Sequence, residues 1–211
     1  MLPPLVLALL GSTEFLGLRN QGQTCYMNSL LQSLYHLPSF RRMVYKMRSN
    51  PDELPGTSIP LELQRVFYQL QYGLGRGLPD VGTELLTSSF GWGWQEVNEQ
   101  QDVQEFWHML YEALAERSTG SANSAIAQLC EGSMLNQVQC THVNFRSERE
   151  ECFCDLQMQV SGCSSLLESF CKFVEEQRLD GDNCYNTRDL RFGRQEARRR
   201  ARLKRLPPVL Q

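Results

Sequence analysis

Cys25 is the residue with the clearest potential for chemistry, because it stands where a polar loop gives way to an apolar helix. The segment Gly17–Gln23 is mostly polar, whereas apolar residues recur at helical spacing from Met27 to Leu34. Thr24 is a residue type that often precedes a helix as its N-cap, so we expect Cys25 at the first helical position. Unpaired backbone N–H groups and the positive end of the helix dipole favour a thiolate there. A small buried packing residue is the alternative that this position leaves open.

Asn20 lies five residues before Cys25, in the loop that leads into the predicted helix. Its side-chain amide has the chemistry of an oxyanion-hole donor, which must lie beside the nucleophile. The alternative is a turn residue whose side chain bonds to its own backbone.

Residues 20–32, with the sequence NQGQTCYMNSLLQ, resemble the cysteine box of the ubiquitin-specific proteases. These are papain-like cysteine proteases that remove ubiquitin from proteins. The resemblance implies that Cys25 is the nucleophile and that Asn20 stabilises the oxyanion. It also implies that the partners are ubiquitin or ubiquitinated proteins.

A second segment places acidic residues at the start of a helix predicted from Gln101 to Glu116. Asp102 and Glu105 stand at positions i and i+3, on one side of that helix start. Acidic residues also stabilise a helix N-terminus without any further role. The segment resembles the glutamine-glutamine-aspartate box of the same family, which implies that Gln101, Asp102 and Glu105 bind the arginine-bearing tail of ubiquitin. Carboxylates form short, charge-assisted hydrogen bonds to guanidinium groups.

Three further segments match the branch of the family near the herpesvirus-associated ubiquitin-specific protease. They are Phe90–Trp92, Leu179–Asn183 and Leu206–Leu210.

Periodicity changes along the chain from helical to alternating. We expect short helices at 39–47, from about 60 to 70, at 83–88 and at 166–176, and strands at 134–145, 150–160 and 203–210. Two of the strands would be joined by a turn at 146–148. The basic run 194–205 is expected to be a solvated or disordered linker, with an anionic-surface patch as a weaker alternative.

Helices first and strands later favour an α+β fold. Together with the resemblance, this order predicts a helical thumb at 15–128 and fingers with the beginning of a palm sheet at 129–211. Residues 1–14 would be a lead outside the core. The domain would thus be the N-terminal part of a papain-like catalytic domain, and incomplete.

The cysteines do not form a recognisable zinc pattern. Many members of the family carry a zinc ribbon in this region, built from two pairs of cysteines. Here Val143 and Thr187 stand three residues after Cys140 and Cys184, so each pair lacks one ligand. We therefore expect no metal, and no cofactor.

A general base for Cys25 is not apparent. The three histidines are His36, His108 and His142, and none is preceded by Gly or followed by Tyr, as in the histidine box of the family. The sequence ends at Gln211 without that box, so we expect weak or no activity from this chain alone. The alternative function is a non-catalytic ubiquitin-binding or scaffold protein, or a truncated fragment of the enzyme.

Composition limits the partners and the cellular compartment that we expect for this protein. A net charge of −3 gives no general reason to expect nucleic-acid binding, and no segment is long enough to span a membrane. The apolar run near the N-terminus has about six residues, shorter than the ~7–15 of a signal peptide. Eight irregularly spaced cysteines favour a reduced, intracellular setting, in the cytoplasm or the nucleus.

Overall fold

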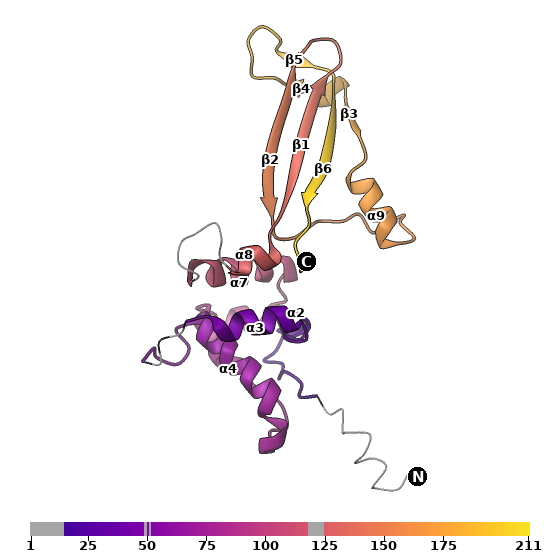
Figure 1. Ribbon diagram of the computed structural model, residues 1–211. Coiled ribbons are helices and arrows are strands. Elements are labelled where there is room, and N and C mark those ends of the chain that lie inside the picture. Colours follow the sequence, from indigo (N-terminus) through magenta and orange to yellow (C-terminus); the bar gives the residue numbers. More distant parts are fainter. Residues whose placement is uncertain (1–14, 49, 51, 118–124) are drawn as a thin grey trace. The chain divides into compact units, whose positions relative to one another are not determined.

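The computed structural model describes residues 15–48, 50, 52–117 and 125–211, and it divides into two compact units. The first unit ends at Ile126 and the second begins at Ala127. Figure 1 shows helices in the first unit and mainly strands in the second. The expected N-terminal lead, residues 1–14, lies outside the described residues. The chain is therefore a mixed helix and sheet protein in which the helices come first.

The first unit is built from helices around one apolar core. Its helices are α2 (Cys25–Tyr35), α3 (Pro38–Lys46), α4 (Ile59–Tyr72), η1 (Leu74–Arg76), α5 (Glu84–Ser89), α6 (Trp94–Asn98) and α7 (Val103–Arg117), and α8 (Ala125–Cys130) spans the boundary. The completely buried core side chains include Met27, Leu31, Phe40, Leu63, Phe67, Phe106 and Leu110. The expected helices are thus confirmed, with small shifts of their ends.

Two helices begin elsewhere than the sequence predicted. Helix α3 begins at Pro38 rather than at residue 39, because a proline at the first helical position needs no N–H partner. Helix α7 begins at Val103 rather than at Gln101, since the Asp102 carboxylate accepts a hydrogen bond from the Gln104 N–H at 2.7 Å and so precedes the helix.

Helix α4 buries a charge that its sequence pattern did not indicate. The Glu62 side chain is buried, whereas the apolar Leu61 remains half-exposed. One carboxylate oxygen of Glu62 accepts from the Gly56 N–H at 2.9 Å and pairs with Arg65 at 2.6 Å. This arrangement ties the loop before α4 to the first turn of the helix.

The second unit contains an antiparallel sheet with the strand order β2-β1-β6-β3 and a small β4-β5 pair. The strands are β1 (Gly132–Cys140), β2 (Arg146–Phe153), β3 (Gln177–Leu179), β4 (Tyr185–Asn186), β5 (Arg194–Gln195) and β6 (Ala197–Arg205). Helix α9 (Leu166–Phe173) and the turn η2 (Gly181–Asn183) complete the unit. The chain reverses at 141–145, so the turn predicted at 146–148 is wrong.

The basic run is not a linker. Residues 197–205 form β6, an inner strand that pairs with β1 on one side and β3 on the other. Backbone hydrogen bonds hold such a strand in place whatever its side chains are, and Arg198, Arg200 and Arg202 extend into solvent. The strand predicted at 203–210 accordingly lies earlier and ends at Arg205.

The tip of the sheet is closed by aromatic and hydroxyl contacts. The Phe145 ring packs against Tyr185 and Phe192, with ring centroids 6.3 and 6.0 Å apart. Thr187 is buried, and its hydroxyl donates to the Gly193 carbonyl at 2.9 Å. Val143 and Thr187 stand at the two positions where a cysteine would be needed to complete the two pairs of a zinc ribbon. At one of them, the threonine is engaged in a hydrogen bond.

We predict that the purified protein contains no stoichiometric zinc and that EDTA leaves its melting temperature unchanged. The aromatic cluster and Thr187 provide contacts at the tip without a metal ligand set. Plasma mass spectrometry and thermal unfolding with and without chelator test this. As a comparison, Phe145→Ala is expected to lower the free energy of unfolding by ~1–3 kcal/mol. One zinc per chain, or a lower melting temperature in EDTA, would show the prediction to be wrong.

Candidate active site

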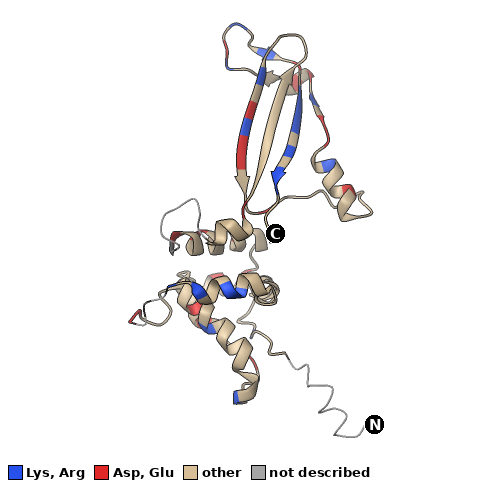
Figure 2. Cartoon of the chain, in the orientation of Figure 1, with Lys and Arg blue, Asp and Glu red and all other residues tan. Residues whose placement is uncertain are grey.

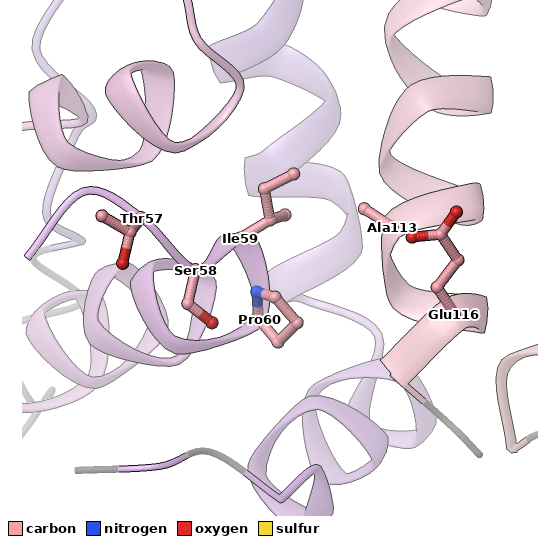
Figure 3. A pocket seen from close by; sticks show the side chains of 6 residues that line it. All are labelled: Thr57, Ser58, Ile59, Pro60, Ala113 and Glu116. Carbon is pink, nitrogen blue, oxygen red and sulfur yellow. The ribbon is translucent and has the colours of Figure 1, made fainter. Parts of the chain in front are cut away.

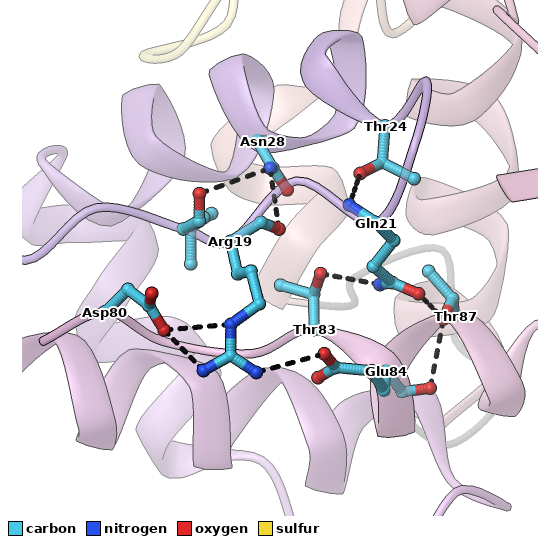
Figure 4. Close-up of polar contacts among 9 residues, drawn as sticks. Arg19, Gln21, Thr24, Asn28, Asp80, Thr83, Glu84 and Thr87 are labelled. Atoms are coloured by element: carbon cyan, nitrogen blue, oxygen red, sulfur yellow. Dashed lines mark hydrogen bonds and ion pairs between the residues drawn. The ribbon is translucent and has the colours of Figure 1, made fainter. Parts of the chain in front are cut away.

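The loop before α2 is held by hydrogen bonds to two helices (Figure 4). The Gln21 side chain donates to the hydroxyl of Thr83, the residue before α5, at 2.8 Å and accepts from the hydroxyl of Thr87, within α5, at 3.2 Å. Asn28 of α2 donates to the Arg19 carbonyl at 3.2 Å. The Arg19 guanidinium in turn pairs with Asp80 at 2.6 Å. These contacts fix the backbone that leads to Cys25.

The side-chain oxygen of Asn20 folds the loop onto itself. It accepts hydrogen bonds from the Gly22 N–H at 3.3 Å, the Thr24 N–H at 3.1 Å and the Thr24 hydroxyl at 3.0 Å. The turn role considered from sequence is therefore present. Because all three bonds use the oxygen, the amide N–H₂ group of this exposed side chain remains available to another acceptor. This amide group belongs to a side chain that is hydrogen-bonded to Thr24, the residue immediately before Cys25.

Thr24 does not cap α2 with its side chain, which corrects the prediction from sequence. Its buried hydroxyl accepts from the Gln21 N–H at 3.1 Å and donates to Asn20 instead. The helix has no side-chain cap and no acidic residue in its first turn. The N–H groups at the start of α2 are consequently left for a thiolate or an oxyanion.

Cys25 is the first residue of α2, as predicted, and its side chain is exposed. A packing role is therefore excluded for this cysteine. An exposed thiol at an uncapped helix start is accessible to an electrophile.

Gly22 allows the loop to pass close to α6. Its φ of +151° is a conformation that L side chains rarely adopt. A Cβ atom at this position would lie 2.5 Å from the Asn98 side-chain oxygen and 3.0 Å from the Val97 carbonyl. The neighbouring Gln23 N–H donates to the same Val97 carbonyl at 2.8 Å. Glycine is thus required here by close backbone approach.

An aromatic cluster joins the start of α2 to the start of α7. The Tyr26 ring packs edge-on against Phe106 at 6.2 Å, and Trp92 lies 5.8 Å from the same Phe106 ring. Phe90 stacks on Trp92 at 5.3 Å and contacts Phe106 at 5.5 Å. The sequence marked Phe90 and Trp92 only as a branch motif, whereas the structure gives them a positioning role.

Tyr26 is a site residue that sequence reasoning missed. Among the described residues its buried hydroxyl has no hydrogen-bond partner. Burial raises the pKa of this hydroxyl, and the neighbouring Cys25 and Glu105, both anionic when deprotonated, raise the pKa further. The Coulomb effects of both groups on one hydroxyl mean that the two sequence signatures lie close together in the fold.

The acidic box lies at the exposed start of α7. Asp102 and Glu105 are exposed, and Gln101 is half-buried. Asp102 caps the helix through its bond to the Gln104 N–H, so the stabilising role considered from sequence is present for this residue. Val103, which was predicted to face the core, is 45% exposed. The polar side of the helix start therefore faces solvent together with one apolar side chain.

Of the three histidines, His36 lies far from Cys25 along α2. It stands 11 positions after Cys25, which is about 16 Å along the helix axis. Its ring packs against Phe15 and Tyr35. His142 belongs to the second unit and lies 3.3 Å from a Glu196 carboxylate oxygen. His108 lies on α7, three residues after Glu105.

A separate hollow of about 340 Å³ lies between the start of α4 and the end of α7 (Figure 3). Its lining residues are Thr57, Ser58, Ile59, Pro60, Ala113 and Glu116. Glu116 is the one titratable group among them, and no predicted site residue lines the hollow. Because its lining contains no cysteine, no histidine and none of the predicted site residues, it is not the candidate reaction site.

Comparison with known proteins identifies the family of this chain. A family profile described as ubiquitin carboxyl-terminal hydrolase matches residues 16–211. Ubiquitin C-terminal hydrolase 12 of Arabidopsis thaliana is 46% identical over 200 residues, which are 94% of this chain and 17% of that relative. Ubiquitin carboxyl-terminal hydrolase 5 of Schizosaccharomyces pombe is 42% identical and ubiquitin carboxyl-terminal hydrolase 7 of Drosophila melanogaster is 41% identical, with the same coverage. This chain thus spans about a sixth of the length of these relatives. The chain belongs to the ubiquitin carboxyl-terminal hydrolase family.

Proposed function

We propose that this chain carries the nucleophile, the oxyanion donor and the tail-binding acids of a cysteine deubiquitinase. The observation that carries the proposal is the exposed Cys25 thiol at the uncapped start of α2, directly after a loop folded around the Asn20 side chain. The family profile and the names of the relatives support ubiquitin as the substrate.

In the proposed reaction the Cys25 thiolate attacks the carbonyl carbon at the end of the ubiquitin tail. The carbonyl oxygen becomes an oxyanion, which the Asn20 amide N–H₂ and the free N–H groups of α2 stabilise. The C–N bond breaks and the amine of the attached protein leaves after taking a proton from water, while a thioester of ubiquitin remains on Cys25. Water then releases ubiquitin. This chemistry requires no metal or cofactor.

The tail-binding role belongs to the start of α7. Glu105 and Asp102 are exposed carboxylates, and Glu105 shares the surroundings of Tyr26 with Cys25. An arginine of the ubiquitin tail that binds there would carry the following residues toward the thiol. Gln101, half-buried at the helix start, would contribute a neutral hydrogen bond.

Within the family, we assign this chain to the branch near the herpesvirus-associated ubiquitin-specific protease. The motif Phe90–Trp92 supports it, since both rings pack around Phe106 next to the tail-binding acids. Within that assignment, residues 15–128 form the thumb, and residues 129–211 the fingers and the beginning of the palm. The thumb carries every proposed site residue.

The proposed setting is the cytoplasm or the nucleus. All eight cysteines are free thiols, which suits a reducing compartment. Among the described residues, no helix has the length and apolar character needed to cross a bilayer.

The role of Asn20 is tested by Asn20→Asp. Aspartate keeps the oxygen that accepts from Gly22 and Thr24 but lacks the N–H₂ donor. We expect an unchanged melting temperature and hydrolysis of a ubiquitin C-terminal thioester slowed by ~10²–10³-fold. Asn50→Asp is the matched control, because the Asn50 side-chain oxygen also accepts a backbone hydrogen bond in a loop, from the Asp52 N–H at 3.1 Å. An Asn20→Asp rate within twofold of the parent rate would reject the oxyanion role.

The tail-binding role is tested by the double variant Asp102→Asn/Glu105→Gln. Asparagine keeps the cap on α7, so the helix should remain intact. We expect ubiquitin affinity, measured by calorimetry, to fall about tenfold, because two charge-assisted contacts become neutral ones. Glu112→Gln/Glu116→Gln changes the charge of the same helix equally at its other end and should leave the affinity unaltered. Equal affinities of both variants would contradict the assignment.

The 211 residues alone are predicted to hydrolyse a fluorogenic ubiquitin C-terminal amide very slowly. Amide cleavage needs an acid to protonate the leaving amine, and general acid–base help is typically worth ~10²–10⁴ in rate. His36 lies too far along α2 to supply it. Labelling by a ubiquitin probe with a C-terminal electrophile should still occur, and Cys25→Ala should abolish it, whereas Cys171→Ala, at another exposed cysteine, should not.

Fast amide hydrolysis that disappears in both Cys25→Ala and His108→Ala would make His108 the base and overturn this prediction. Reversible ubiquitin binding without any labelling would instead favour a non-catalytic binding protein.

A further inference from the structure

Strand β6 contributes a row of cations to one face of the four-stranded sheet. Arg198, Arg200 and Arg202 alternate with residues of the other face, and the register places Arg178 of β3 directly opposite Arg198. All four side chains are exposed. Figure 2 shows the resulting blue bands along β6. We call Arg178, Arg198, Arg200 and Arg202 the basic row.

The basic row is short of counterions. Arg198 pairs with Glu176 at 3.4 Å. Within the described part of the chain, no carboxylate lies within ion-pair distance of Arg178, Arg200 or Arg202. The direct opposition of Arg178 and Arg198 is itself unfavourable, because like charges across a strand pair repel. A bound anion would remove this repulsion.

Charged residues of both signs border the basic row. Arg146 of β2 lies on the same face and pairs with Glu148, and Lys204 of β6 pairs with Glu150. Glu148 and Glu150 of β2 lie on the same face, opposite Gln137 and Leu135 of the intervening strand β1. They are two strand spacings from β6, or about 9–10 Å. On the other side, Arg200 shares a hollow of about 630 Å³ with Glu168, Glu175 and Glu176. Among the described residues, the cations of this face that lack an ion-pair partner are therefore Arg178, Arg200 and Arg202.

We propose that the basic row binds an extended acidic polypeptide segment that lies along β6. Alternate residues of an extended chain are ~6.6–6.8 Å apart, which equals the spacing of Arg198, Arg200 and Arg202 along their own strand. Carboxylates on alternate residues of the partner would each meet one guanidinium, whose planar fork suits bidentate contact. The basic row fits a single chain of this kind.

A nucleic acid fits the same surface less well. Single strands bind to sheets through aromatic residues that stack on bases, whereas the β1 side chains beside the row are Leu135, Gln137 and Gln139. A duplex would bring a second phosphate strand over β2, where Arg146 is already paired with Glu148 and Glu150 with Lys204.

This binding surface rests on the proposed deubiquitinase function only in that it adds a second contact to the proposed site in the first unit. It uses neither Cys25 nor the acids of α7. Its test is consequently separate from the tests of the catalytic proposal, and Cys25→Ala should bind the acidic segment like the parent chain.

The probe is a fluorescein-labelled nine-residue peptide with Glu at alternate positions and Thr between them, measured by anisotropy with the 211-residue chain. We expect saturable binding that weakens as salt is raised, because exposed charge pairs are screened. Arg200→Gln/Arg202→Gln should weaken binding about tenfold, because two charge-assisted contacts to the peptide are lost. Arg149→Gln/Arg199→Gln, on the opposite face of the sheet, should stay within twofold of the parent.

Three results would overturn the proposal. The first is equal binding of a peptide with Gln in place of Glu. The second is equal weakening by the two double variants, which would indicate a response to net charge alone. The third is tighter binding of a ten-residue oligothymidylate that displaces the peptide, which would assign the surface to nucleic acid.

Discussion

The packing of Tyr26, Phe90, Trp92 and Phe106 is the constraint on which the candidate site depends. These four rings join three segments far apart in the chain: the first turn of α2, the turn after α5 and the first turn of α7. Aromatic pairs of this kind contribute about 0.5–1.5 kcal/mol each beyond the area they bury. Because Tyr26 directly follows Cys25 and Phe106 directly follows Glu105, the cluster sets the separation of the proposed nucleophile and the proposed tail-binding acid.

In the loop before α2, some side-chain groups hold the turn by hydrogen bonds and others keep free donors. The oxygen of Asn20 and the hydroxyl of Thr24 hold the turn, while Gln21 attaches it to α5. Among the described residues, the Asn20 N–H₂ and the first N–H groups of α2 have no hydrogen-bond partner, and both are donors. Free donors at this point suit an anion.

The second unit tolerates many charges in its sheet because both faces are largely open to solvent. Three exposed pairs across or near the strands, Lys204–Glu150, Arg149–Glu151 and Arg198–Glu176, balance part of the positive charge. Such pairs contribute little to stability, so the sheet depends on its backbone ladder and on apolar residues such as Ala197 and Phe153, which are buried. Among the described residues, Arg200 and Arg202 of β6 have no ion-pair partner.

The sequence by itself determined the helix of Cys25, the α+β order and the residue types of the site, because local periodicity and turn chemistry encode them. It did not reveal that Thr24 gives its hydroxyl to the loop, that Glu62 is buried or that Tyr26 lies between the two signatures. Nor did it place residues 197–205 inside a sheet, since a run of arginines carries no apolar alternation. Each of these features depends on a partner distant in the chain, and such pairings are decided only when the tertiary structure forms.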